Sequence, residues 1–495
     1  MMYGEEKSDS LIVAAKQANN PKGAESVERR SGAKGNAEQP HMRRTQSRES
    51  MSQRLSRVRE AAKQRKKERF TALFHLLTVE ALEAAFLSLS RKAAAGVDGI
   101  RWMDYAGNMK NNITDLHRRL HQGSYRAQPG RRHYIPKADG KQRPLGIASL
   151  EDKIVQYALV KILNAVYEND FMGFSYGFRP GRSQHDALDA LATGLVRTNV
   201  NWVLDADISQ FFDRVSHEWL IRFTEHRIGD RRVIRLIRKW LTAGTSEEGQ
   251  WRATEEGTPQ GAVISPLLAN IYLHYVFDLW AHQWRRRYAT GNVVMVRYAD
   301  DIVIGFDKRY DARRFRIAMQ RRLREFGLTV HPEKTRLMEF GRFAAENRAI
   351  RGKGKPETFN FLGFTHISGK DRNGRFMLIR KTRRDRMTAT LKAIKDGLRR
   401  RWHYSIPEQG KWLRRVVQGY LNYHSVPGNY PMMRKFRIYV TDLWRRALRR
   451  RSQQDDTTWT KANRLAAVWL PKVRVLHPWP VERFTARHPR QEPGA

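Results

Sequence analysis

The stretch VVMVRYADDIVIGF, residues 293–306, places two adjacent carboxylates, Asp300 and Asp301, between two apolar runs. Valine, isoleucine and tyrosine favour strands, and a short polar break between two such runs predicts a β-hairpin. Burying either charge without a partner would cost several kcal/mol. The two aspartates therefore either face water, as in an ordinary acidic turn, or hold a cation.

A second acidic strand is predicted earlier in the chain, within VLDADISQFFD, residues 203–213. The period of two along a strand puts Asp205 and Asp207 on the same face. Magnesium prefers oxygen ligands, usually one or two carboxylates together with substrate phosphates. Two strands that each offer aspartates would suit two such ions, which is the arrangement used for in-line phosphoryl transfer.

These acidic blocks resemble the palm of a reverse transcriptase. Between them lies a third block of the same type in the same order, GTPQGAVISPLLANIYL, residues 257–273. The combination most closely resembles group II intron-encoded reverse transcriptases, or maturases, from about Phe86 to about His424. The resemblance implies an α+β fold with right-hand polymerase architecture, in which fingers and a palm with an antiparallel sheet precede an α-helical thumb.

The composition agrees with a nucleic-acid partner. Lysine and arginine number 93 against 50 aspartate and glutamate residues, a formal net charge of +43, and such a field calls for polyanions. An RNA-binding structural protein would share this charge, but it would need no acidic constellation. The chain has no cysteine, which excludes disulfides, cysteine–zinc sites and iron–sulfur clusters.

Other classes of protein are excluded by missing patterns. No apolar run reaches the roughly 20 residues of a membrane span, so we expect no membrane association. The sequence contains neither a GxxxxGK[ST] phosphate loop nor an HExxH zinc helix. We expect a bacterial cytoplasmic or nucleoid-associated protein.

We expect four parts along the chain. Residues 1–65 are a basic and largely disordered extension that becomes helical near Ser52, and both a solvated tail and an RNA-binding arm fit this composition. Residues 66–370 would form the fingers and palm, and residues 371–455 the basic helical thumb or maturase domain. Residues 456–495 would be a basic tail, either a DNA-binding remnant or a packing segment, in which we expect no endonuclease domain.

Several helix starts can be predicted from capping residues. Ser149 with Asp152 suggests a capping box, and Ser183 is typical of an N-cap. Ser265, followed by proline, predicts another N-cap. Asp213 would cap the helix after the acidic strand.

The resemblance implies roles for the residues around the two acidic blocks. Asp207, Asp300 and Asp301 match the catalytic aspartates, and together with Ile208 they would bind two magnesium ions. Asp205 is the second choice for a metal ligand. Magnesium is thus the expected cofactor.

Other residues match positions that contact the incoming nucleotide. Lys137 and Arg143 flank a predicted turn in a basic hairpin and would hold the triphosphate. The same sequence pattern is also typical of an exposed charged hairpin that has no binding role. Gln260 would touch the nucleotide. Phe212 matches the sugar gate, where an aromatic ring leaves no room for a 2′-hydroxyl, whereas its pattern alone suggests a core aromatic.

Basic residues elsewhere would contact RNA or the primer–template. The expected set is Arg179, Arg182, Lys334, Arg380, Lys381, Arg383 and Arg384.

The predicted function is an RNA-directed DNA polymerase encoded by a group II intron. It would extend a DNA primer on an RNA template with deoxynucleoside triphosphates, and it would bind and splice its intron RNA and support retrohoming into target DNA. One alternative is a domesticated or non-intron reverse transcriptase of the retron, diversity-generating, CRISPR-associated or defence type. Another is an RNA-binding splicing cofactor without polymerase activity.

Overall fold

The acidic hairpin predicted from the sequence lies at the centre of an α+β fold. The computed structural model describes residues 39–136, 142–247, 249–451 and 457–487. A four-stranded, wholly antiparallel sheet has the order β6-β7-β3-β8. Its strands are β3 (Trp202–Asp207), β6 (Val293–Tyr298), β7 (Asp301–Phe306) and β8 (Arg336–Glu339). Every side chain from Val293 to Arg297 is buried, which explains the long apolar run.

The fold contains two further sheets, one of four strands and one of three. One has the order β2-β1-β4-β5, and the other has the order β11-β10-β9. The basic hairpin predicted around residues 125–147 is formed by β1 and β2, with its turn outside the described residues. The bounds are β1 (Gly130–Pro136), β2 (Gln142–Ile147), β4 (Thr245–Glu247), β5 (Gln250–Arg252), β9 (Phe359–Phe361), β10 (Phe364–Lys370) and β11 (Phe376–Thr382).

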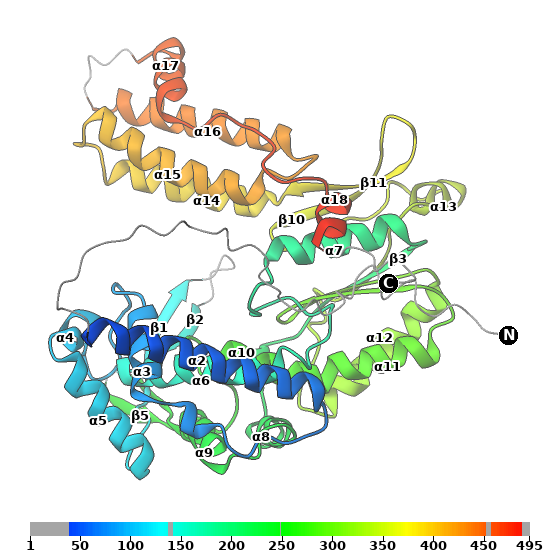
Figure 1. Ribbon diagram of the computed structural model, residues 1–495. Coiled ribbons are helices and arrows are strands. Elements are labelled where there is room, and N and C mark those ends of the chain that lie inside the picture. The colour runs from blue at the N-terminus through cyan, green and yellow to red at the C-terminus, as the bar shows by residue number, and fades with distance from the viewer. Residues whose placement is uncertain (1–38, 137–141, 248, 452–456, 488–495) are drawn as a thin grey trace, which may run out of the picture.

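Helices cover the central sheet and share one apolar core with it (Figure 1). The helix α6 carries the predicted apolar face at the middle of this core. The helices and single turns of this body are α2 (Gln39–Gln64), η1 (Phe74–Leu76), α3 (Val79–Ser88), α4 (Trp102–Ala106), α5 (Met109–Gln122), α6 (Leu150–Tyr167), α7 (Gln184–Arg197), η2 (Phe211–Asp213), α8 (His217–Glu225), α9 (Arg231–Thr242), α10 (Ser265–Leu273), the π-turn η3 (His274–Asp278), α11 (Leu279–Tyr288), α12 (Arg309–Arg324) and α13 (Ala344–Ile350).

The helix α2 corrects the boundary expected for the N-terminal extension. It begins at Gln39 rather than near Ser52, and its last turns pack on the body. Ala62 is fully buried, and the Arg227 guanidinium donates a hydrogen bond to the Arg65 carbonyl at 3.0 Å. The sequence missed this packing because the helix is strongly polar and only a few of its side chains reach the core.

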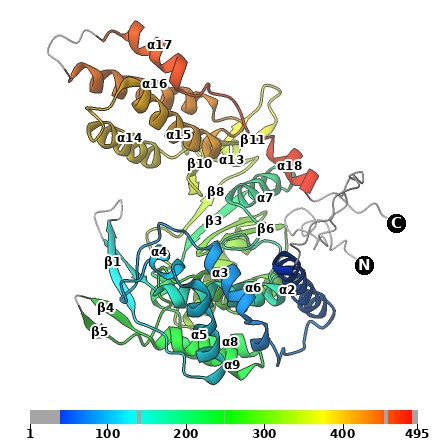
Figure 2. The ribbon, with the colours of Figure 1, turned by 60° about the vertical axis from the view of Figure 1, so that its left-hand side comes forward.

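The predicted basic helices after the sheets form a separate bundle with its own apolar core. The bundle lies to one side of the body in both views (Figures 1 and 2). Its helices are α14 (Arg384–Arg399), α15 (Ile406–His424), α16 (Tyr430–Arg449) and α17 (Trp459–Trp469). The helix α17 falls in the expected basic tail, and Ala466 is buried in the bundle core, which fits the packing segment that was one of the two alternatives for this tail.

The last helix, α18 (Pro480–Arg487), returns from the bundle to lie on α7. Asp189 on α7 accepts hydrogen bonds from Arg483 of α18 and from Arg380 of β11. The chain beyond the bundle is thereby joined to the body. Within the described residues, no helix is long and apolar enough to cross a membrane.

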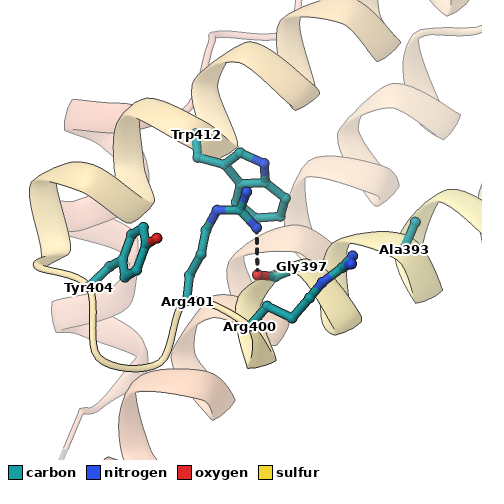
Figure 3. Close-up of a pocket in the computed structure, with 6 residues that line it drawn as sticks. All are labelled: Ala393, Gly397, Arg400, Arg401, Tyr404 and Trp412. Atoms are coloured by element: carbon teal, nitrogen blue, oxygen red, sulfur yellow. Dashed lines mark hydrogen bonds between the residues drawn. The ribbon is translucent and has the colours of Figure 1, made fainter. Parts of the chain in front are cut away.

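A cavity of about 330 Å³ opens between α14 and α15 (Figure 3). The Arg401 guanidinium lies 4.4 Å from the Trp412 ring centroid and donates to the Gly397 carbonyl at 3.0 Å. The Trp412 ring packs directly on Gly397, where a β-carbon would clash with it. The indole therefore packs against both Arg401 and Gly397, as expected for a packing residue.

The capping predictions were partly right. The Ser149 and Ser183 side chains each accept a hydrogen bond from the backbone three residues on, as predicted. Ile264 rather than Ser265 is the N-cap of α10, and the Ser265 hydroxyl donates instead to the Pro259 carbonyl at 2.8 Å. Ser216, not Asp213, caps α8.

Candidate active site

The predicted carboxylates lie where neighbouring strands of the central sheet end. In the pairing of β3 with β7, Asp207 lies directly opposite Asp301. Asp300 occupies the turn between β6 and β7, immediately before Asp301. The register of the antiparallel sheet therefore brings three acidic residues, two of them far from the third in sequence, to one edge. Asp205 lies farther along β3, opposite Val303.

The surrounding protein raises the pKa values of carboxyl groups in and near the acidic cluster. Asp301 reaches solvent, yet desolvation by the protein, followed by repulsion from Asp300 and Asp207, raises its pKa to about 7. Burial is also the main cause that raises the pKa of Asp300. Burial likewise raises the pKa of Asp205 to about 7. Such a cluster is stabilised by a nearby cation.

Lys334 supplies one such positive charge. Its Nζ donates a hydrogen bond to Asp207 Oδ2 at 2.8 Å. The segment before it is anchored to the strand, because the His331 amide donates to the Asp207 carbonyl at 2.7 Å. Lys334 was predicted to contact nucleic acid, and the structure brings it to the acidic cluster.

The donor chemistry of the cluster fits a divalent cation. Three carboxylates whose mutual repulsion and desolvation raise the pKa of Asp300 and Asp301 are ligands of the type that magnesium prefers. Across the described parts of the chain, no three acidic or histidine side chains already surround a single point as metal ligands would. Asp207 is instead turned to Lys334. The Ile208 side chain is buried, so only its carbonyl oxygen could join such a site.

A buried arginine that the sequence analysis missed supports the acidic turn. Arg297 on β6 is fully buried, and it forms a two-pronged ion pair with Asp278, with N–O distances of 2.7 and 2.6 Å. Its Nη1 donates to the Ala299 carbonyl at 3.0 Å, and its Nη2 donates to the Ser175 hydroxyl at 2.7 Å. Ala299 has a φ of 56°, a left-handed conformation that is costly for a residue with a side chain. The guanidinium thus holds the strained residue next to Asp300.

A close backbone approach also positions the turn. A β-carbon at Gly177 would clash with the Ala299 backbone, so only glycine fits there. The Gly177 carbonyl is itself fixed, because Asn270 Nδ2 on α10 donates to it at 2.7 Å. A periodic pattern shows neither contact, because both depend on residues distant in sequence.

The residues predicted to contact a nucleotide lie around η2 and the loop before α10. Phe212 is half-buried, with its ring centroid 6.4 Å from that of Phe178. Gln260 donates to Asp213 Oδ1 at 2.7 Å, which explains why Asp213 does not cap α8. Arg143 on β2 is exposed and close enough for its charge to lower the pKa of Asp300. Lys137 lies outside the described residues.

Three of the arginines predicted to contact nucleic acid instead brace the interior. Arg179 is buried, forms an ion pair with Glu168 at 2.9 Å and donates to backbone carbonyls. Arg380 is 1% exposed and pairs with Asp189 at 3.3 Å. Arg182 is half-buried and also donates to backbone carbonyls. A buried guanidinium already paired inside the protein is not available to phosphate, so the assignments of Arg179 and Arg380 are corrected to structural ones.

The remaining predicted basic residues lie where β11 leads into α14. Lys381 and Arg384 are exposed, and Arg383 pairs with Asp385 at 2.7 Å. The charge of Arg383 partly offsets the effect of burial, which raises the pKa of Asp205. This junction therefore presents positive charge next to the acidic edge of the central sheet.

Comparison with known proteins agrees with this geometry. Residues 135–366 match the model of the family described as reverse transcriptase (RNA-dependent DNA polymerase). Protein YkfC of Escherichia coli (strain K12) is 42% identical over 214 residues, which cover 42% of this chain and 55% of that protein.

The names of two further relatives refer to introns. The group II intron-encoded protein LtrA of Lactococcus lactis subsp. cremoris is 38% identical over 222 residues, covering 44% of this chain and 37% of that protein. The putative COX1/OXI3 intron 1 protein of Saccharomyces cerevisiae is 26% identical over 396 residues, covering 66% of this chain and 46% of that protein. The chain thus spans about half the length, or less, of these relatives. Residues 135–366, which carry the acidic edge and its supporting residues, are a reverse transcriptase domain related to those of group II intron-encoded proteins.

Proposed function

We propose that the chain is an RNA-directed DNA polymerase that extends a DNA primer on an RNA template with deoxynucleoside triphosphates. The observation that carries the proposal is the pairing of Asp207 with Asp301 across β3 and β7, with Asp300 in the adjoining turn. In this proposal the central sheet is the palm, the β1–β2 hairpin with its neighbours forms the fingers, and α14–α17 form the thumb.

Magnesium is the proposed cofactor, bound as two ions. Reverse transcriptases act with a divalent metal, and we propose Asp207, Asp300, Asp301 and the Ile208 carbonyl as its ligands. When bound, magnesium would lower the pKa of a primer hydroxyl and stabilise charge on the reacting phosphate. Lys334 would release Asp207 as the metal arrives, and it would remain close enough to neutralise phosphate charge.

The protein's own residues would position the nucleotide. The charge of Arg143 acts on Asp300, so this side chain is near the acidic cluster. We propose that Arg143 and Lys137 bind the phosphate oxygens of the nucleotide. Phe212 would pack under the sugar, where its ring leaves no room for a 2′-hydroxyl. Gln260, held by Asp213, would contact the nucleotide beside the new base pair.

Primer extension tests the proposal. Purified wild-type protein should extend oligo(dT) on poly(rA) with dTTP and magnesium. Asp300→Ala should reduce extension at least about a thousandfold, because it removes a proposed metal ligand, while RNA binding changes little. Extension by an Asp300→Ala preparation at the wild-type rate would exclude this site.

A second proposed activity is binding and splicing of an intron RNA, with retrohoming into DNA. Its support is the similarity to LtrA and the exposed positive charge of Lys381 and Arg384. Splicing should survive Asp300→Ala, whereas Lys381→Ala combined with Arg384→Ala should weaken both splicing and extension. Splicing that requires the carboxylates would contradict a separate maturase role. It would not affect the polymerase proposal.

A non-intron reverse transcriptase of the retron, diversity-generating, CRISPR-associated or defence type is the alternative assignment. Both assignments predict extension, so they differ in the RNA that is bound. Selective binding of a group II intron RNA over an unrelated RNA of equal length would favour the intron type. Equal binding of both RNAs would favour the alternative.

A further inference from the structure

A basic groove lies on the body at the foot of α9. It is a cavity of about 550 Å³, and four arginines line it, one from the segment before η1 and three from α9. They are Arg69, Arg231, Arg235 and Arg238. We call these four residues and the cavity between them the α9 groove.

The framework of the α9 groove is rigid. The segment that carries Arg69 runs beside residue Ile228, because the Phe70 amide donates to the Arg227 carbonyl and the Gly229 amide donates to the Phe70 carbonyl, both at 2.8 Å. The helix α9 is anchored by six buried side chains, one of which, Ile234, also lines the groove. Arginines on two such fixed elements lose less conformational freedom on binding than arginines on a free loop.

The charge of the α9 groove is almost uncompensated. Glu225 is the one carboxylate that lines it, and this carboxylate pairs with Arg238 at 3.3 Å. The buried Asp230 at the start of α9 faces inward instead, where it accepts hydrogen bonds from the Leu73 and Phe74 amides. Three arginines are left to face the cavity with no acidic residue lining it beside them.

A solvated helix face is the ordinary explanation for exposed arginines, but α9 departs from it. Such faces usually interleave acidic and basic residues, because like charges three or four positions apart repel. The helix contains no acidic residue, and Arg231, Arg235 and Arg238 stand at those unfavourable spacings. The protein keeps this repulsion in the free state, as expected where a polyanion relieves it.

The geometry favours phosphates over bases or an acidic peptide. Helical rise spreads Arg231 and Arg238 along about 10 Å. A duplex carries a charge for about every 1.7 Å of its axis, so several phosphates fall within this length. Arginine binds phosphate oxygens in a bidentate manner. No aromatic side chain lines the groove, so it offers no platform for base stacking.

The α9 groove belongs to the end of the body that is remote from the bundle. Figures 1 and 2 both show α8 and α9 at the end of the molecule remote from α14–α17. A primer–template held between the central sheet and the bundle would leave it uncovered. We propose that the α9 groove binds the phosphate backbone of a duplex segment of RNA while the central sheet and the bundle hold primer–template.

The choice of RNA rests on the proposed function, in which the template is RNA. A second segment of the same RNA molecule would bind at a raised effective concentration once the first is engaged. The groove would thus hold a folded part of the RNA during copying. Its phosphate contacts predict recognition of RNA structure with little dependence on sequence.

Binding by full-length protein that already holds primer–template tests this inference. The protein is saturated with unlabelled poly(rA)/oligo(dT), and a fluorescent RNA stem–loop is then titrated at several salt concentrations, read by anisotropy. The test variant is Arg231→Gln/Arg235→Gln/Arg238→Gln. The matched control is Arg313→Gln/Arg321→Gln/Arg324→Gln, which removes three exposed arginines from α12 and causes the same change in net charge.

The α9 variant should bind the stem–loop at least about tenfold more weakly than wild type, and its slope of log K against log salt should shrink by about two to three. The α12 control should stay near wild type. Extension of poly(rA)/oligo(dT) by the α9 variant should remain within about twofold of wild type. Both triple variants should keep the wild-type melting temperature, since all the replaced side chains are exposed.

Four results would overturn the inference. The α9 variant could bind like the control, or the preloaded wild type could fail to bind the stem–loop. Polyglutamate could displace the RNA at lower charge concentration, which would indicate an acidic protein partner, or a DNA stem–loop could bind more tightly than RNA. If the wild type fails to extend any primer, the polymerase proposal fails, and the binding comparison still decides this one.

Discussion

At the residue scale, the turn that carries Asp300 depends on a buried guanidinium. Arg297 links β6 to Asp278, Ser175 and the strained Ala299, and each contact lies behind the carboxylates rather than among them. Its role in this account is positioning. A buried ion pair contributes little net free energy to folding, although removing one partner is costly. The Arg297–Asp278 pair therefore serves to position the turn more than to stabilise the fold.

This role can be separated from folding by replacing both partners together. Removing one charge would leave the other buried and cost about 3–5 kcal/mol, whereas apolar replacement of a pair is often neutral. Arg297→Met/Asp278→Leu should therefore lose less stability than either single variant, and it should lower kcat for extension at least about tenfold, with little change in KM for dTTP. Wild-type kcat in a folded double variant would show that the turn needs no such support.

Phe212 gives a second residue-scale prediction. Its ring is half-buried beside Phe178, so a smaller side chain would open space without collapsing the core. Phe212→Ala should raise the ratio of UTP to dTTP incorporation by at least about tenfold, because a 2′-hydroxyl would no longer clash. Steady-state incorporation of each nucleotide measures this ratio. An unchanged ratio would return Phe212 to the core role that its pattern alone suggests.

At the element scale, buried histidines lie where the body meets the bundle. Burial lowers the pKa of His366 on β10 to about 3 and that of His424 on α15 to about 4. His366 stacks on Phe359 with ring centroids 4.7 Å apart. Below an unfolded-state pKa of about 6.5 the unfolded chain takes up these protons and the folded chain does not. Stability from these groups is therefore full above that pH and falls as pH decreases toward the folded pKa values.

The expected acid sensitivity is about 1.4 kcal/mol for each pH unit and each histidine within that window. His366→Asn removes one such group, so its melting temperature should fall less between pH 6.5 and 4.5 than that of wild type. Differential scanning fluorimetry across this range gives both curves. Parallel curves for the two proteins would mean that His366 does not contribute to the acid sensitivity.

The elements also show what local sequence can and cannot predict. The hairpin around Asp300, the capping of α6 and α7 and the bundle helices follow from apolar periodicity, turn residues and capping side chains, all of which act over a few positions. Arg297 was missed because its hydrogen-bond partners Ser175, Asp278 and Ala299 are brought together only by folding. Arg380 was misassigned because its partner Asp189 lies on a distant helix.

At the scale of the whole molecule, positive charge is divided between interior bracing and exposed surface. The net charge of +43 predicts a polyanion partner, but it does not tell which arginines contact it. Arg179 and Arg380 stabilise the core, while Lys381, Arg384 and the α9 groove remain available on the surface. The net charge alone therefore overestimates the surface available for binding nucleic acid. The family match to residues 135–366 does not include α14–α17, so it gives no information on the charge of the bundle.

The most direct test of the central claim is single-turnover addition of one dTMP to a primer already bound on its RNA template. The wild type is compared with Asp207→Asn, Asp300→Asn and Asp301→Asn, which keep the side-chain shape and remove one charge each. All three variants should lose at least about a thousandfold in rate while primer–template affinity changes less than about threefold. A wild-type rate in any one of them would contradict the assignment of these three carboxylates as a single site.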